Sequence, residues 1–106
     1  MAEANILLVE DDADLREALL DTLMLAHYDC VDVGSAEEAI LALKVNHFDM
    51  VISDVQMDGI GGMGLLSYLQ QHQPKVPVLL MTAYATINSA VSAMIILLSL
   101  LHQKCY

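Results

Sequence analysis

Short apolar runs that stop abruptly at a polar residue are the feature of this sequence that most constrains its fold. They occupy residues 5–9, 30–33, 50–53 and 78–81. A run of four or five such residues is typical of a strand that is buried on both faces of a sheet. Helical patterns lie between the runs, so the order is strand, helix, strand, helix. This alternation predicts an α/β fold in which a parallel sheet has helices on both faces.

The segments between the runs carry signals for helix starts. Two capping boxes are present, Asp14 with Glu17 and Ser35 with Glu38. We interpret the glycine-rich segment 58–64 as a flexible loop that leads into a third helix. A further helical pattern resumes at residues 87–94. No internal repeat or linker divides the chain, which predicts a single domain over residues 1–106.

The charge of the chain limits its partners. It has 14 Asp and Glu against 4 Lys and Arg, a balance that repels nucleic acid and anionic membranes but suits a divalent cation or a basic partner. The longest apolar run is far shorter than the ~20 residues of a membrane span. The two cysteines form no disulfide framework, and the N-terminus lacks a basic signal region. We therefore expect a cytoplasmic domain that binds neither nucleic acid nor a membrane.

Polar side chains that could carry chemistry follow three of the apolar runs. Asp11 and Asp12 follow the first, Asp54 the third and Thr82 the fourth. In a doubly wound sheet, ligands bind outside the carboxyl ends of the strands, where the strand order reverses. In the flavodoxin-like order 2-1-3-4-5, the first and third strands are neighbours at that point. The three aspartates are thus predicted to converge on one crevice.

Carboxylates that converge in this way repel one another. Two charges about 5 Å apart cost roughly 3 kcal/mol at an effective dielectric constant of about 20, which corresponds to about two pKa units. Such a group should either hold a proton or bind a cation. Mg²⁺ suits a site of one or two carboxylates that is completed by waters and phosphate oxygens. A carboxylate beside Mg²⁺ can also attack a phosphoryl group to form an aspartyl phosphate.

Three segments, residues 6–12, 51–57 and 76–83, and the spacings between them, resemble the receiver domains of bacterial two-component response regulators. Residues 81–94 are similar to the enhancer-binding transcription activators of the nitrogen-regulatory type. The resemblance covers residues 5–94. It implies a phosphorylation switch that receives its phosphoryl group from a sensor histidine kinase and controls the output domains of a parent transcription activator.

The resemblance also implies roles for individual residues near the acidic crevice. Asp54 would be the phosphoacceptor and a Mg²⁺ ligand. Asp12 would ligate Mg²⁺ directly, Asp11 would act largely through water, and the backbone carbonyl of Gln56 would be a third protein ligand.

Two further residues would contact the phosphoryl group, although the end of the chain departs from the family pattern. Thr82 would hydrogen-bond the phosphoryl oxygens, and Lys104, at the position expected of the family lysine, would pair with them. Residues 95–106 form a divergent tail in which Leu101 replaces the switch aromatic and a fifth helix is missing. An apolar tail without its covering helix would favour a homodimer.

Two alternatives stay open. A small Mg²⁺-dependent phosphohydrolase that works through an aspartyl phosphate would need a second carboxylate two residues after Asp54, where the chain has Gln56. A pseudo-receiver would be an interaction module that is never phosphorylated, and the divergent tail is compatible with it. The main prediction is a phosphoacceptor switch that is not an enzyme beyond catalysing its own phosphorylation and dephosphorylation.

Overall fold

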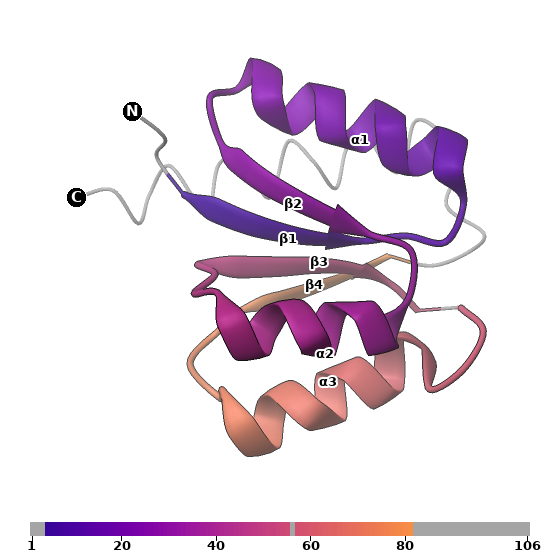
Figure 1. The fold of residues 1–106 in the computed structure, drawn as a ribbon, viewed down its shortest axis with the longest axis vertical. Helices are drawn as coiled ribbons and strands as arrows, with labels where there is room; N and C mark the ends of the chain where they lie inside the picture. The colour runs from indigo at the N-terminus through magenta and orange to yellow at the C-terminus, as the bar shows by residue number, and fades with distance from the viewer. Residues whose placement is uncertain (1–3, 56, 82–106) are drawn as a thin grey trace.

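The computed structural model describes residues 4–55 and 57–81 of the 106-residue chain, and alternates strands with helices (Figure 1). The elements are β1 (Asn5–Val9), α1 (Ala13–Leu25), β2 (Asp29–Val33), α2 (Ala36–Val45), β3 (Met50–Asp54), α3 (Gly61–His72) and β4 (Val78–Met81). In the described part of the chain, no helix is long and apolar enough to cross a membrane.

The four strands form one parallel sheet in the order β2-β1-β3-β4. The chain therefore passes over β1 on its way from β2 to β3, and the strand order reverses between β1 and β3. This confirms the flavodoxin-like order for the first four strands. The predicted fifth strand and the missing fifth helix lie outside the described residues.

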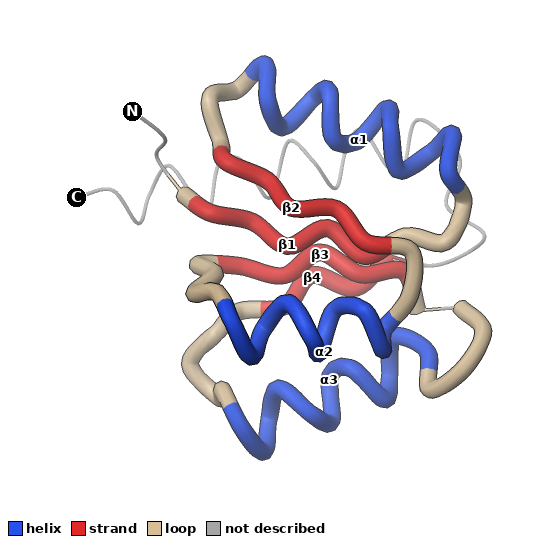
Figure 2. The backbone as a smooth tube through the Cα atoms, in the orientation of Figure 1, coloured by secondary structure: helices blue, strands red, loops and turns tan. Residues whose placement is uncertain are grey.

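The helices cover the sheet in two layers, with α1 on one face and α2 and α3 on the other (Figure 2). Alternate residues of β1 serve the two layers. Ile6 and Leu8 pack in the core under α1, whereas Leu7 and Val9 pack in the core under α2 and α3. All four side chains are fully buried. A strand buried on both faces needs an unbroken apolar run, because neither side of it meets water.

The start of α1 differs from the prediction. The helix begins at Ala13, and its N-cap is Asp12, whose carboxylate accepts hydrogen bonds from the backbone N–H groups of Asp14 and Leu15. The predicted capping box of Asp14 and Glu17 is therefore wrong, because the side chain that caps the helix is Asp12, two residues before Asp14. The second capping box is confirmed, because Ser35 Oγ accepts from the backbone N–H of Glu38.

The glycine-rich segment is only partly a loop. We predicted that residues 58–64 would lead into the third helix, but α3 already begins at Gly61. Gly62 shows why glycine is needed at this start. A Cβ atom on Gly62 would lie 2.3 Å from the backbone carbonyl oxygen of Asp54. The absent side chain thus lets the first turn of α3 pack directly against the end of β3.

Candidate functional site

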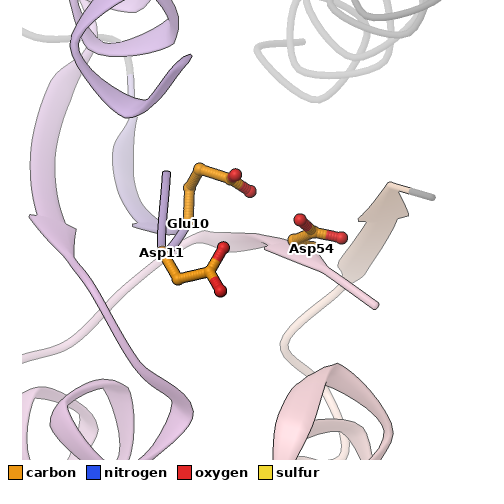
Figure 3. Close-up of side chains that lie close together, drawn as sticks. All are labelled: Glu10, Asp11 and Asp54. Carbon is orange, nitrogen blue, oxygen red and sulfur yellow. The ribbon is translucent and has the colours of Figure 1, made fainter. Parts of the chain in front are cut away.

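Three carboxylates meet where β1 and β3 end. The two strands pair with Val9 opposite Ser53, so Glu10 and Asp54 follow side by side. Glu10, Asp11 and Asp54 each offer a carboxylate oxygen, and these oxygens all lie within 4.8 Å of one another (Figure 3). Glu10 and Asp54 are buried, with 2% and 7% of their surface exposed, whereas Asp11 is open to solvent. The site is an acidic cluster at the strand-order reversal.

The backbone of Asp54 is held by its neighbours. Ser53 Oγ donates a hydrogen bond of 3.0 Å to the Asp54 carbonyl oxygen. Val55, the next residue, is bonded on both sides. Its N–H donates to the Met81 carbonyl of β4 at 2.7 Å, and its carbonyl accepts from the Gly62 N–H of α3 at 3.1 Å. The carboxylate of Asp54 therefore projects from a fixed strand end.

Burial, together with the nearby carboxylates, raises the pKa of Glu10 from 4.5 to about 7. Burial is the main cause, followed by a hydrogen bond with the carboxyl group of Asp54 and by the negative charges of Asp54 and Asp11. A hydrogen bond from the backbone N–H of Asp12 acts in the opposite direction. Without a cation, Glu10 thus binds a proton more readily than an ordinary glutamate, as expected where carboxylates are crowded.

The same groups fit a divalent cation. Glu10 Oε1 accepts from the Asp12 backbone N–H at 3.3 Å, whereas no donor in the described part of the chain reaches the buried Oε2. The hydrogen bond between Glu10 and Asp54 therefore needs a proton on one of the two carboxyl groups. A buried carboxylate oxygen without a donor is costly unless a positive charge satisfies it. Carboxylate oxygens are also the ligands that Mg²⁺ prefers. Glu10, Asp11 and Asp54 could therefore hold this ion.

The predicted site residues are placed as follows. The structure brings Asp11 and Asp54 together but uses the Asp12 carboxylate to cap α1, so direct ligation of Mg²⁺ by Asp12 stays a prediction. Gln56, Thr82 and Lys104 lie outside the described residues.

Sequence analysis missed Glu10. Glu10 directly follows the apolar run of β1, just as Asp54 directly follows the apolar run 50–53 of β3. This matching position could have identified Glu10 as a neighbour of Asp54.

Residues 6–99 match the family model of the response regulator receiver domain. The chain belongs to this family. Among curated proteins, the receiver domain is 52% identical over 91 residues to the response regulator protein FleR of Pseudomonas aeruginosa, a match that covers 86% of this chain and 19% of FleR. It is 36% identical over 92 residues to the C4-dicarboxylate transport transcriptional regulatory protein DctD of Rhizobium meliloti, which covers 87% of this chain and 20% of DctD. This chain thus spans about a fifth of the length of these relatives.

Solved structures confirm the fold of the receiver domain. The Francisella response regulator 1452 receiver domain superposes with a TM-score of 0.80 at 17% identity, covering 97% of this chain and 99% of that one. The response regulator TrrA of Thermotoga maritima, solved in complex with Mg²⁺ and BeF, superposes with a TM-score of 0.74 at 29% identity. That match covers 89% of this chain and 80% of TrrA. A relative of this fold thus binds Mg²⁺, and the described acidic cluster supplies suitable ligands here.

Proposed function

We propose that this receiver domain accepts a phosphoryl group on Asp54 from a sensor histidine kinase, with Mg²⁺ held by Glu10, Asp11 and Asp54. The observation that supports this most is the cluster of three carboxylates within 4.8 Å around the nearly buried Asp54. Two structures of the relative TrrA add support, since one contains Mg²⁺ and BeF and the other is a complex with the histidine kinase ThkA.

In the proposed reaction, a carboxylate oxygen of Asp54 forms a bond to phosphorus while the bond from phosphorus to the donor nitrogen breaks. The fixed end of β3 aims that oxygen, because the backbone around Asp54 is hydrogen-bonded to β4 and α3. Bound Mg²⁺ supplies positive charge that offsets the charges of the carboxylates and the incoming phosphoryl oxygens. Thr82 and Lys104 are proposed to contact those oxygens as well.

The proposed consequence is a switch in a longer regulatory protein. FleR and DctD are regulators about five times as long as the matched segment, so output domains that control transcription are proposed for the parent of this chain. Phosphorylation of Asp54 would precede that output. A cytoplasmic location follows from the same proposal, because the kinase donor and the regulated genes are reached there.

The test is a mass measurement. The folded protein is incubated with Mg²⁺ and a small phosphodonor such as acetyl phosphate, and its intact mass is recorded. We expect one phospho-adduct that is lost in Asp54→Asn and kept in Asp58→Asn, a matched control at an exposed aspartate of the next loop. A folded wild type without an adduct would favour a pseudo-receiver. Rapid turnover of ordinary phosphate esters would favour a phosphohydrolase instead.

A further inference from the structure

We propose that Arg16 is a positioning residue for the acidic site, because its guanidinium group fixes the backbone between Glu10 and Asp11 in the orientation that turns both carboxylates toward Asp54. This inference rests on the proposed function, since it concerns the affinity of the same site for Mg²⁺. It assigns a role to a side chain that is neither a ligand of the cation nor part of the hydrophobic core.

Arg16 contacts two strand ends from the first turns of α1. Its Nη1 donates a hydrogen bond of 2.8 Å to the backbone carbonyl oxygen of Glu10. Its Nε lies 3.3 Å from Oδ2 of Asp32, near the end of β2. A quarter of the Arg16 side chain and 37% of the Asp32 side chain are exposed, so solvent partly screens this ion pair. One planar guanidinium thus bridges the end of β1 to β2.

The Arg16 contact completes a set of bonds around residues 10–12. On one side, the Glu10 N–H donates to the Val33 carbonyl at 3.1 Å. On the other, the Asp12 N–H donates to Glu10 Oε1, and the Arg16 N–H donates to the Asp12 carbonyl at 2.9 Å. The Glu10 carbonyl, held by Arg16, sets the plane of the peptide that leads into Asp11. Since Asp11 itself is exposed, this peptide is the main restraint on where its carboxylate points.

The turn after β2 leaves room for the guanidinium. A Cβ atom on Gly34 would lie 3.1 Å from Arg16 Nη1, closer than side-chain carbons normally approach. The Gly34 N–H is bound elsewhere, by Glu38 Oε2 at 3.0 Å, so the turn is held in place while its missing side chain opens the path to the Glu10 carbonyl. The Arg16 guanidinium therefore occupies space that a side chain at position 34 would restrict, and three quarters of the Arg16 side chain is buried.

Charge alone predicts the opposite effect of Arg16 on a cation. A guanidinium one hydrogen bond away from Glu10 repels a divalent ion at the site, so its removal should tighten Mg²⁺ binding if electrostatics dominated. Loss of positioning should weaken binding instead, since side chains that orient metal ligands typically change metal affinity by about 10- to 100-fold. The sign of the change separates the two roles.

The test measures Mg²⁺ affinity by titrating the full chain with MgCl₂ and following amide resonances by two-dimensional NMR, which also shows whether each variant is folded. We expect Arg16→Gln to raise the Kd for Mg²⁺ by about tenfold. Arg16→Lys keeps the charge and one donor and should lie between Arg16→Gln and the wild type. Asp32→Asn, the matched control, leaves the Glu10 contact in place and should stay within about threefold of the wild type.

The possible results are distinct. An unchanged or lower Kd in Arg16→Gln would overturn the positioning role while leaving the Mg²⁺ site intact. An equal loss in Asp32→Asn would overturn the assignment to the Glu10 carbonyl and point to the ion pair. If Arg16→Gln does not fold, Arg16→Lys and Asp32→Asn are compared instead. A higher Kd for Mg²⁺ in Arg16→Lys than in Asp32→Asn supports the Glu10 contact, and any other result overturns it. A folded wild type that binds no Mg²⁺ would overturn the proposed function together with this inference.

Discussion

Glu10 and Asp54 show how two carboxylates in one site come to differ. Both lie at the ends of buried strands, but burial and the nearby negative charges raise the pKa of Glu10 to about 7. Without a cation, Glu10 is therefore the carboxyl group of the cluster that binds a proton most readily. A bound cation would replace that proton.

The raised pKa of Glu10 makes the stability of the metal-free protein depend on pH. Between its unfolded value of 4.5 and about 7, the folded state binds more protons than the unfolded state, so the free energy of unfolding should fall as pH rises through this window. Glu10→Gln should remove this loss and be more stable than the wild type at pH 8, by roughly 1 to 3 kcal/mol. Urea denaturation in EDTA at several pH values measures the difference.

The exposed Glu17→Gln, on α1, is the matched control for this experiment and should keep the wild-type slope. An equal pH dependence in Glu10→Gln and the wild type would show that Glu10 does not hold the proton.

At the residue scale, the ends of the apolar runs predicted that Asp11 and Asp54 would converge, but they did not predict that Glu10 would join them. Crowded carboxylates, a proton or a cation, and a location at the strand-order reversal all followed from where the apolar runs end. The choice between Glu10 and Asp12 could not be made, because it depends on which residue pairs with Asp54 across the strands and on which one caps α1. A one-residue change of register moves every side chain to the opposite face.

Among the elements, the start of α1 offers a test of what Asp12 does. Asp12→Ala should lower the free energy of unfolding by about 1 kcal/mol, because the N–H groups of Asp14 and Leu15 lose their acceptor. Asp12→Asn should cost much less, since an asparagine oxygen also caps a helix. Chemical denaturation of both variants in EDTA measures this.

The same two variants decide whether Asp12 is also a ligand. If Mg²⁺ binds only to Glu10, Asp11 and Asp54, Asp12→Asn should keep the wild-type Mg²⁺ affinity while Asp11→Asn loses most of it. A loss as large in Asp12→Asn would favour the sequence-based assignment of Asp12 as a direct ligand.

The contact of α3 with β3 predicts a cost for any side chain at position 62. In Gly62→Ala, the new methyl group would lie 2.3 Å from the Asp54 carbonyl oxygen, a backbone atom that cannot move aside easily. We expect a loss of roughly 1 to 3 kcal/mol in stability and slower phosphorylation, because the end of β3 must shift. Thermal denaturation and the acetyl phosphate assay measure the two effects. Ser67→Ala, at an exposed position of the same helix, should change neither.

The elements were predictable to the extent that their signals were local. The runs of β1 and β4 and the capping box at Ser35 appear in the structure where the sequence placed them. The start of α3 was misplaced, because Gly61, Gly62 and Gly64 favour a loop by their own conformational freedom. Packing of Gly62 against the end of β3 outweighs that preference. The sequence alone does not show that Gly62 lies this close to Asp54.

At the scale of the whole molecule, the net charge of −10 on 106 residues should affect stability. Mutual repulsion of like charges destabilises a compact state, and salt screens it over about 10 Å at 0.1 M. In EDTA, raising NaCl from about 0.02 to about 0.5 M should therefore raise the urea midpoint. A midpoint that falls with NaCl would show that the attractive pairs, such as Arg16 with Asp32, outweigh the repulsion.

The strand order also determines when the acidic site can exist. Ile6 of the central strand β1 pairs with Met50, and Glu10 meets Asp54 only after the intervening chain has returned over the sheet. A nascent chain that has emerged from the ribosome only as far as β2 contains Glu10 and Asp11 but lacks Asp54. If the three carboxylates hold a cation as proposed, that ability would therefore appear during synthesis only once β3 has paired with β1.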